Sequence, residues 1–178
     1  MIRALTFALA LLSTQVSAIE VSGPVRMMDG DTFAIGGQVI RLHGVDAFEN
    51  GQDCTKGGRS YNCGATALNA LRGLVGTDTV HCSGTVFDDY DRLIGVCHAG
   101  AVDLSAALVR AGYGLAYVEF SDDYVGEERE AEAAGRGAWA GEFVTPWTFR
   151  ANGWANAAQE APDGQCCVFR VNAGTDFS

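Results

Sequence analysis

Hydrophobic and polar residues alternate along the chain just beyond residue 18, and the pattern later changes to a helical spacing. The alternating part carries β-branched residues and glycine breaks, which predicts three strands at 21–28, 32–35 and 38–45, joined by tight turns. Apolar residues then recur every three or four positions over 65–75, which predicts a helix. The chain therefore begins with a strand meander that leads into a helix.

Two more strands and two more helices are expected downstream. Residues 78–87 and 93–98 predict a strand pair with a polar connecting loop. A helix over 103–111 has an aspartate cap at its start and a glycine directly after its end. A third helix, with acidic residues in its first turns, is expected from a cap at Ser121 to about Arg136.

A chain of 178 residues is long enough for one domain with a sizeable core. Residues 1–18 have a basic start, an apolar run and a small-residue cleavage site, which predicts an export signal peptide. An uncleaved membrane anchor is the alternative, but the apolar run is far shorter than the roughly 20 residues that a spanning helix needs. We expect the domain at 19–150, followed by a mobile tail at 151–178. Within the domain, the polar, glycine-rich residues 46–63 predict a loop.

All six cysteines lie beyond the predicted signal peptide, which indicates disulfides and a secreted or periplasmic protein. We expect Cys54 to pair with Cys63 and Cys82 with Cys97, because each pair closes a short loop between segments that should be neighbours. The two remaining cysteines are adjacent in the tail, and the sequence leaves their pairing open.

A zinc site is the alternative for the second pair, since His81-Cys82 and Cys97-His98 mirror each other across the predicted hairpin. Successive side chains of a strand point to opposite faces of the sheet, so the cysteines would share one face and the histidines the other. Zinc needs four ligands that converge tetrahedrally. Strand geometry therefore argues against zinc.

The chain is acidic, with 12 Lys and Arg residues against 22 Asp and Glu residues and a net charge of −10. Affinity for nucleic acid normally comes from basic groups that neutralise phosphates, and Lys56 is the single lysine of the sequence. Nucleic-acid binding would therefore be local and weak, and helped by a metal ion.

Five charged residues nevertheless suit phosphodiester chemistry: Asp31, Arg41, Asp46, Glu49 and Arg92. The carboxylates can hold a hard divalent cation and activate water. The guanidinium groups can bind phosphate oxygens through two hydrogen bonds each. Together they supply a metal site, a base and charge stabilisers.

The motifs that carry these residues occur in a specific order and spacing: DGDTF at 29–33, RLHGVDAFE at 41–49, YDR at 90–92, LVRAG at 108–112 and AY at 116–117. In this combination the chain resembles the staphylococcal nuclease, or thermonuclease, family over most of its length beyond the signal peptide. The resemblance implies an α+β OB-fold, a five-stranded barrel with three helices, which agrees with the predicted order of elements.

The resemblance also implies a metal site and a base. Asp31 and Asp46 match the calcium ligands, with the backbone carbonyl of Ala47 as a further oxygen donor. Glu49 matches the residue that activates or orients the attacking water.

The remaining roles concern the substrate. Arg41 and Arg92 match the pair that stabilises the phosphoryl transition state. Tyr90, Tyr117 and Phe120 are expected to contact the nucleotide. The implied activity is calcium-dependent endonucleolytic cleavage of DNA and RNA that leaves 3′-phosphate ends. A monomer without stable membrane association is expected.

Four positions depart from the family pattern, and one of them is Glu119, which lies near where some members have an aromatic residue. Phe48 stands where the family usually has proline, Asp91 where it has glycine, and Asp89 where it has a basic residue. The two aspartates place negative charge beside Arg92. In addition, strict alternation would separate the arginine of the second motif from its aspartate, so the strand must bend or end near Gly44.

Two other functions fit parts of the pattern. An OB-fold can serve as a non-catalytic module that binds nucleic acid or protein with a degenerate active site, but such a module needs neither Glu49 nor two arginines beside a metal site. A glycosidase uses paired carboxylates, but Arg41 and Arg92 would then have no purpose. A nuclease of this kind should need calcium and a glycosidase should not, whereas a binding module should keep its affinity when Glu49 is changed.

Overall fold

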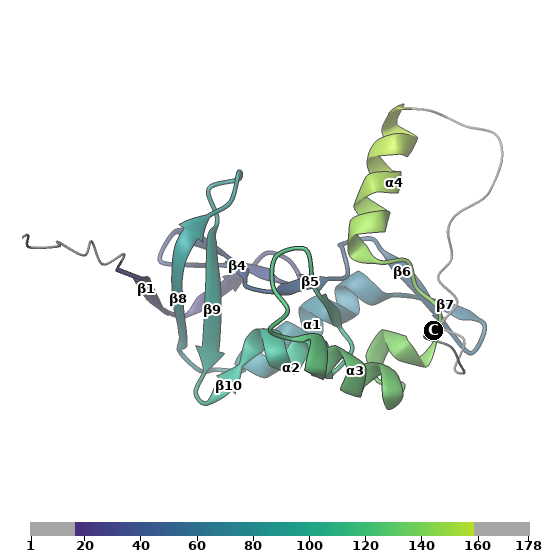
Figure 1. Ribbon diagram of the computed structural model, residues 1–178, viewed down its shortest axis with the longest axis horizontal. Helices are drawn as coiled ribbons and strands as arrows, with labels where there is room; N and C mark the ends of the chain where they lie inside the picture. Colours follow the sequence, from purple (N-terminus) through teal and green to yellow (C-terminus); the bar gives the residue numbers. More distant parts are fainter. Residues whose placement is uncertain (1–16, 159–178) are drawn as a thin grey trace, which may run out of the picture.

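The structure is a computed structural model that describes residues 17–158, with side chains as far as Gly153. A curled β-sheet packs against helices in an α+β arrangement of the OB-fold type, as predicted (Figure 1). The predicted signal peptide, apart from residues 17 and 18, lies outside the described residues. The part of the predicted mobile tail from 159 onward, with Cys166 and Cys167, also lies outside them.

The main sheet has seven strands, with the order β1-β8-β9-β4-β3-β2 and with β10 paired to β9. Neighbouring strands are antiparallel except for β4 and β9, which run parallel. The parallel pair joins the early meander to the later hairpin. The strands are β1 (Ile19–Gly23), β2 (Val25–Met27), β3 (Thr32–Ile35), β4 (Gln38–Leu42), β8 (Val80–Phe87), β9 (Leu93–Ala99) and β10 (Val102–Asp103).

The chain bends after β4, at the expected position. Gly44 has φ +67°, and a Cβ there would lie 2.8 Å from the Tyr124 ring, so both the backbone and the packing favour glycine. Beyond the bend, β5 (Val45–Ala47) leaves the main sheet and pairs with β11 (Gly114–Ala116). The change of direction brings the aspartate of β5 to the arginine of β4.

The prediction of a loop over 46–63 is wrong for its second half, which forms a hairpin of β6 (Asp53–Lys56) and β7 (Arg59–Asn62). Gly57 and Gly58 make the turn with φ +58° and +75°. Most residues of the hairpin are polar and exposed, so they leave no apolar alternation for a sequence pattern to detect.

Two disulfides lie within the described residues, and they are the two pairings that the sequence favours. Cys54 pairs with Cys63, and Cys82 pairs with Cys97. In the second pair the cysteines are directly opposite each other on β8 and β9, and His81 is opposite His98 one position away. Because the cysteines are bonded and the histidines lie on the other face, the four side chains do not form a zinc site.

The first two helices have the caps that their sequences require. In α1 (Cys63–Val75), the Asn62 side chain accepts a hydrogen bond from the amide of Ala65, 2.7 Å away. In α2 (Leu104–Arg110), the Asp103 side chain accepts from the amide of Ala106 at 3.0 Å, as predicted. Both helices pack against the larger core under the sheet, which includes Phe33, Ile40, Leu42, Leu71, Leu93 and Leu108.

The third helix, α3 (Val125–Ala133), begins later than predicted and is followed by the short 3₁₀-helix η1 (Gly137–Ala140). Ser121 is not its cap: the hydroxyl accepts from the amide of Asp123 in a bend before the helix. The helix starts after Tyr124, whose buried ring fills the space beside the Gly44 bend. Tertiary packing therefore determines this start, and the local cap signal does not.

A fourth helix, α4 (Pro146–Ala158), has no counterpart among the predicted elements. Proline occupies its first position, and the Thr145 hydroxyl accepts from the amide of Thr148 at 3.4 Å. The helix projects away from the sheet and from the other helices (Figure 1). No helix within residues 17–158 is long and apolar enough to span a membrane.

Candidate active site

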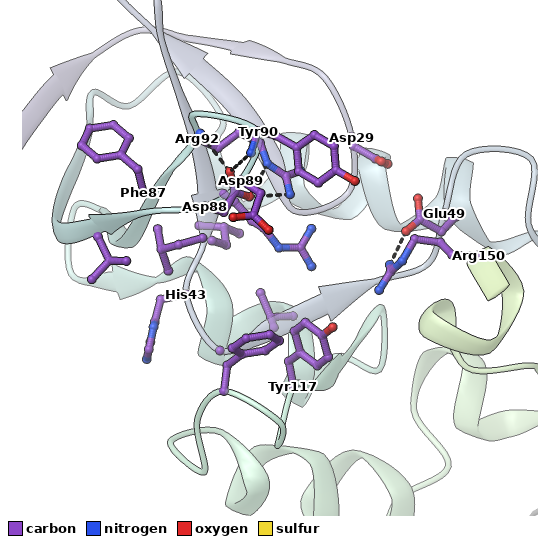
Figure 2. Close-up of a pocket in the computed structure, with 17 residues that line it drawn as sticks. Asp29, His43, Glu49, Phe87, Asp88, Asp89, Tyr90, Arg92, Tyr117 and Arg150 are labelled. Carbon is purple, nitrogen blue, oxygen red and sulfur yellow. Dashed lines mark hydrogen bonds and ion pairs between the residues drawn. The ribbon is translucent and has the colours of Figure 1, made fainter. Parts of the chain in front are cut away.

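A cavity of about 580 Å³ opens beside β4 and the β8–β9 hairpin, and its lining reaches α4 (Figure 2). Arg41, Glu49 and Arg92, the three predicted catalytic residues, all line it. The aromatic candidates Tyr90, Tyr117 and Phe120 line it as well. The fold thus gathers residues from distant parts of the sequence around one space.

The two predicted metal carboxylates lie next to this cavity and are buried. The Asp31 residue is 4% exposed, and Asp46 is fully enclosed. Oδ1 of Asp31 accepts from the Thr32 hydroxyl at 2.8 Å, and Oδ2 accepts from the amide of Ala47 at 3.1 Å. The second bond connects β5 to the residue directly before β3, so the two carboxylates meet at one site.

Arg41 bridges the two carboxylates. Its Nη1 donates to Oδ1 of Asp31 at 3.2 Å, and its Nη2 donates to Oδ1 of Asp46 at 2.7 Å. Burial alone would lower the pKa of Arg41, but the charges of Asp31 and Asp46 outweigh this effect and raise it. Arg41 is therefore a permanent cation held against the acidic pair.

Arg150, in the second turn of α4, is a second cation on the same cluster. Its Nη1 and Nη2 donate to Oδ1 and Oδ2 of Asp46 at 2.9 and 2.8 Å, and Nη1 also donates to Oε1 of Glu49. Burial would lower the pKa of Arg150, but the bonds and charges of Asp46 and Glu49 raise it. The Glu49–Arg150 pair is visible at one side of the cavity in Figure 2.

Glu49 has a raised pKa, because partial burial disfavours its charge more than Arg150 favours it. Its backbone is fixed by Gln52, a buried residue whose Oε1 accepts from the amide of Glu49 at 2.9 Å. Nε2 of Gln52 donates to the carbonyl of Val144 at 2.6 Å, just before α4. Gln52 therefore links the loop that carries Glu49 to the segment that carries Arg150.

Replacing Gln52 with alanine should lower the free energy of unfolding by about 2 kcal/mol, because two partly buried backbone groups lose their partners. Urea unfolding would measure this loss. Gln38→Ala is the matched control: Nε2 of Gln38 donates to the neighbouring Val39 carbonyl in a more open position, so a loss of well under 1 kcal/mol is expected. Equal losses in both variants would show that Gln52 has no special role.

Arg92 lies on the other side of the cavity from Glu49 and is paired with Asp88 (Figure 2). Its Nε donates to Oδ2 of Asp88 at 2.7 Å, its Nη2 forms an ion pair with the same oxygen at 2.6 Å, and its guanidinium lies 5.2 Å from the centre of the Tyr90 ring. Neither Asp89 nor Asp91, the two acidic departures next to Arg92, makes this contact. Asp91 instead occupies the left-handed turn position with φ +60°, which aspartate tolerates.

Aromatic rings form one wall of the cavity. Tyr117 and Phe120 meet edge to face with their ring centres 4.8 Å apart, and the Arg41 guanidinium lies 5.9 Å from the Tyr117 ring. Trp147, in the first turn of α4, is parallel to Tyr117 with ring centres 6.1 Å apart. Phe120 and Tyr90 are largely exposed, which leaves ring surface available to a base.

Phe48, which replaces the usual proline, does not enter the cavity. It is fully buried in a second, smaller core and meets Phe143 edge to face with ring centres 5.3 Å apart. Because Phe143 belongs to the segment that leads into α4, the ring of Phe48 helps to fix the root of that helix. The departure from proline therefore adds a packing contact next to the turn of Glu49.

Asp31 and Asp46 offer the type of ligand atom that a hard cation such as calcium prefers, the carboxylate oxygen. Both oxygens of Asp46, however, accept hydrogen bonds from Arg41 or Arg150. Among the residues that the structure describes, no group of three or more His, Cys, Asp or Glu side chains is arranged to hold a metal ion. In this conformation arginines balance the charge that a cation would balance.

Three residues of the site were absent from the sequence prediction: Arg150, Asp88 and Gln52. Asp88 carries a usable signal, because an aspartate four residues before an arginine across a tight turn can pair with it. Arg150 carries no such sequence signal, because it lies 104 positions after Asp46 and in a helix without an apolar stripe.

Comparison with known proteins gives one family and one relative that the sequence resembles. The family described as staphylococcal nuclease homologue matches residues 39–141, more than half of the chain. The succinoglycan biosynthesis protein ExoI of Rhizobium meliloti (strain 1021) is 29% identical over 145 residues, which cover 78% of this chain and 74% of that protein. The family match includes Arg41, Asp46, Glu49 and Arg92. The chain therefore belongs to the staphylococcal nuclease family.

Proposed function

We propose that this protein is a calcium-dependent endonuclease that hydrolyses phosphodiester bonds of DNA and RNA with little sequence specificity. One observation carries the proposal: Glu49, Arg41 and Arg92 line a single cavity beside the paired carboxylates of Asp31 and Asp46. A base, two guanidinium groups and ligands for a hard cation are what hydrolysis of a phosphodiester requires. Membership of a nuclease family supports the same function.

Each residue has a distinct part in the proposed reaction. Glu49 accepts a proton from water as the water oxygen bonds to phosphorus. Arg41 and Arg92 donate hydrogen bonds to the non-bridging oxygens, where negative charge accumulates. The bond from phosphorus to the 5′ oxygen then breaks, that oxygen takes up a proton, and the other product keeps a 3′ phosphate. Calcium held by Asp31, Asp46 and the Ala47 carbonyl would supply Lewis-acid polarisation of the phosphate.

The substrate must compete with pairs that already exist within the protein. Arg92 is held by Asp88, so a phosphate oxygen has to replace that carboxylate. With a net charge of −10, the chain has little long-range attraction for a polyanion. Stacking on Tyr117, Phe120 and Tyr90 would compensate in part, and it favours unpaired bases over a closed duplex.

The proposed setting is outside the cytoplasm, either secreted or periplasmic, with the protein acting as a monomer without stable membrane association. Two disulfides within residues 17–158 support an oxidising compartment. The residues of the proposed mechanism all come from a single chain, so no second copy is needed to complete the site.

The experiment that tests this function is cleavage of single-stranded DNA, duplex DNA and RNA by the protein lacking residues 1–18. We expect cleavage in calcium, a fall of about 100-fold or more in excess chelator, and faster cleavage of single strands. Product ends that require phosphatase before a polymerase extends them would demonstrate the 3′ phosphate. Cleavage that persists in chelator would contradict the calcium requirement, and no cleavage at any calcium concentration would contradict the nuclease itself.

A non-catalytic nucleic-acid or protein binding module is the second candidate, because Glu49 and Arg92 are both engaged in ion pairs within the protein. If those pairs persist when ligand binds, neither residue is available for catalysis. Binding of single-stranded DNA that is unaffected by Glu49→Gln, together with no cleavage, would favour this candidate.

A further inference from the structure

Arg150 binds the most enclosed acidic group of the site. Two of its nitrogens donate to the two oxygens of Asp46, and one of them also donates to Glu49. The side chain of Asp46 has no exposed surface, so solvent does not reach it while both arginines are in place. Arg41 and Arg150 together therefore occupy both oxygens of this carboxylate.

Because the Asp46 side chain is fully enclosed, a cation can reach it only if one of these arginines withdraws, and the two arginines are not held equally. Arg41 stands in β4, inside the main sheet, bonds Asp31 as well, and has a side chain that is 14% exposed. Arg150 has a side chain that is 28% exposed and stands on α4, which projects from the body of the protein (Figure 1). Withdrawal of Arg150 leaves the sheet intact and therefore disturbs less of the structure.

Helix α4 is fixed at its root, so a movement of Arg150 has a predictable consequence. The carbonyl of Val144 is held by Gln52, which anchors the chain directly before the helix. Trp147 lies one helical turn before Arg150, and residues three apart share a face of a helix. Because Trp147 is parallel to Tyr117 on that face, release of Arg150 should also change the Trp147–Tyr117 contact.

We infer that Arg150 is the resident counter-ion of Asp46 and Glu49, and that it competes with a divalent cation for these carboxylates. The inference rests on the cation site of the proposed function but does not depend on cleavage. Linked equilibria are reciprocal, so removal of the Arg150 guanidinium must strengthen cation binding by the factor by which Arg150 weakens it. Two charge-assisted hydrogen bonds to one buried carboxylate make this factor about tenfold or more.

Calorimetric titration with calcium chloride tests the inference on the whole protein lacking residues 1–18, with its disulfides intact. Arg150→Gln should bind calcium about tenfold more tightly than the native protein, and Arg150→Lys should lie between them, because lysine keeps the charge but not the planar fork. Arg110→Gln is the matched control, since Arg110 pairs with Glu127 and Glu130 on α3, away from the cavity, and its calcium affinity should equal the native value. Circular dichroism and thermal melting establish that each variant is folded.

Tryptophan fluorescence gives a second measurement on the native protein and so covers the case in which Arg150→Gln fails to fold. Calcium should change the emission of the native protein, and most of the change should be lost in Trp147→Phe. Equal or weaker calcium binding by Arg150→Gln, an unchanged emission, or no calcium binding by any variant would overturn the inference. Tighter calcium binding by Arg150→Gln, together with no cleavage of any nucleic acid by the native protein, would support the inference and contradict the proposed nuclease activity.

Discussion

Replacing Glu49 with glutamine should reduce the rate of DNA cleavage at saturating calcium by about 10²- to 10⁴-fold, the range expected for loss of a general base. Glutamine has the same shape and can still accept a hydrogen bond from Arg150, but it cannot take a proton from water. The loss should therefore appear in kcat, whereas KM for single-stranded DNA should change little. Initial rates over a range of substrate concentrations would separate the two.

The matched control for this variant is Glu127→Gln. Glu127 lies on α3 and pairs with Arg110, so it undergoes the same chemical change away from the cavity. Its kcat should stay within about twofold of the native value, since a surface ion pair contributes little. If Glu49→Gln keeps more than a tenth of native kcat, Glu49 does not activate the water and another group of the cavity must do so.

Sequence patterns predict the fold best where local and tertiary preferences agree. The alternation of β4 and the aspartate cap of α2 are local signals. The structure confirms them, because Ile40 and Leu42 are the buried positions of β4 and the Asp103 side chain accepts a hydrogen bond from the amide of Ala106. The start of α3 shows the opposite case, because the cap signal at Ser121 competes with the packing of Tyr124 and loses. Helix α4 has a proline start but no apolar stripe, so periodicity gives no sign of it.

The contacts of the candidate site likewise divide into those that local sequence predicts and those that depend on the assembled fold. Arg41 and Asp46 are close in sequence, and a bend at Gly44 is enough to predict their meeting. The contact between Arg150 and Asp46 spans 104 residues and depends on where the root of α4 is anchored. Such a pairing has no local pattern, and only the assembled fold reveals it. The same limit applies to Gln52, whose importance comes from its burial and from its two partners.

Replacing Arg41 with glutamine should impair both stability and catalysis. Asp31 and Asp46 would keep their burial but lose a shared cation, and breaking a buried ion pair from one side costs about 3–5 kcal/mol of unfolding free energy. Loss of a guanidinium that stabilises the transition state should also lower kcat by about 10²- to 10³-fold. Urea unfolding and cleavage kinetics would measure the two effects on the same preparation.

Two further variants separate these effects of Arg41. Arg41→Lys keeps a positive charge between the carboxylates and should recover much of the stability, but not the rate, because the ammonium cannot bond Asp31, Asp46 and a phosphate oxygen with the planar geometry of arginine. Arg72→Gln removes an exposed arginine whose Nη1 donates to the Asn69 side chain on the surface of α1, and it should change neither quantity appreciably. If Arg41→Lys restores the rate together with the stability, Arg41 acts only by holding the carboxylates in place, and Arg92 alone would stabilise the charge that develops on the phosphate.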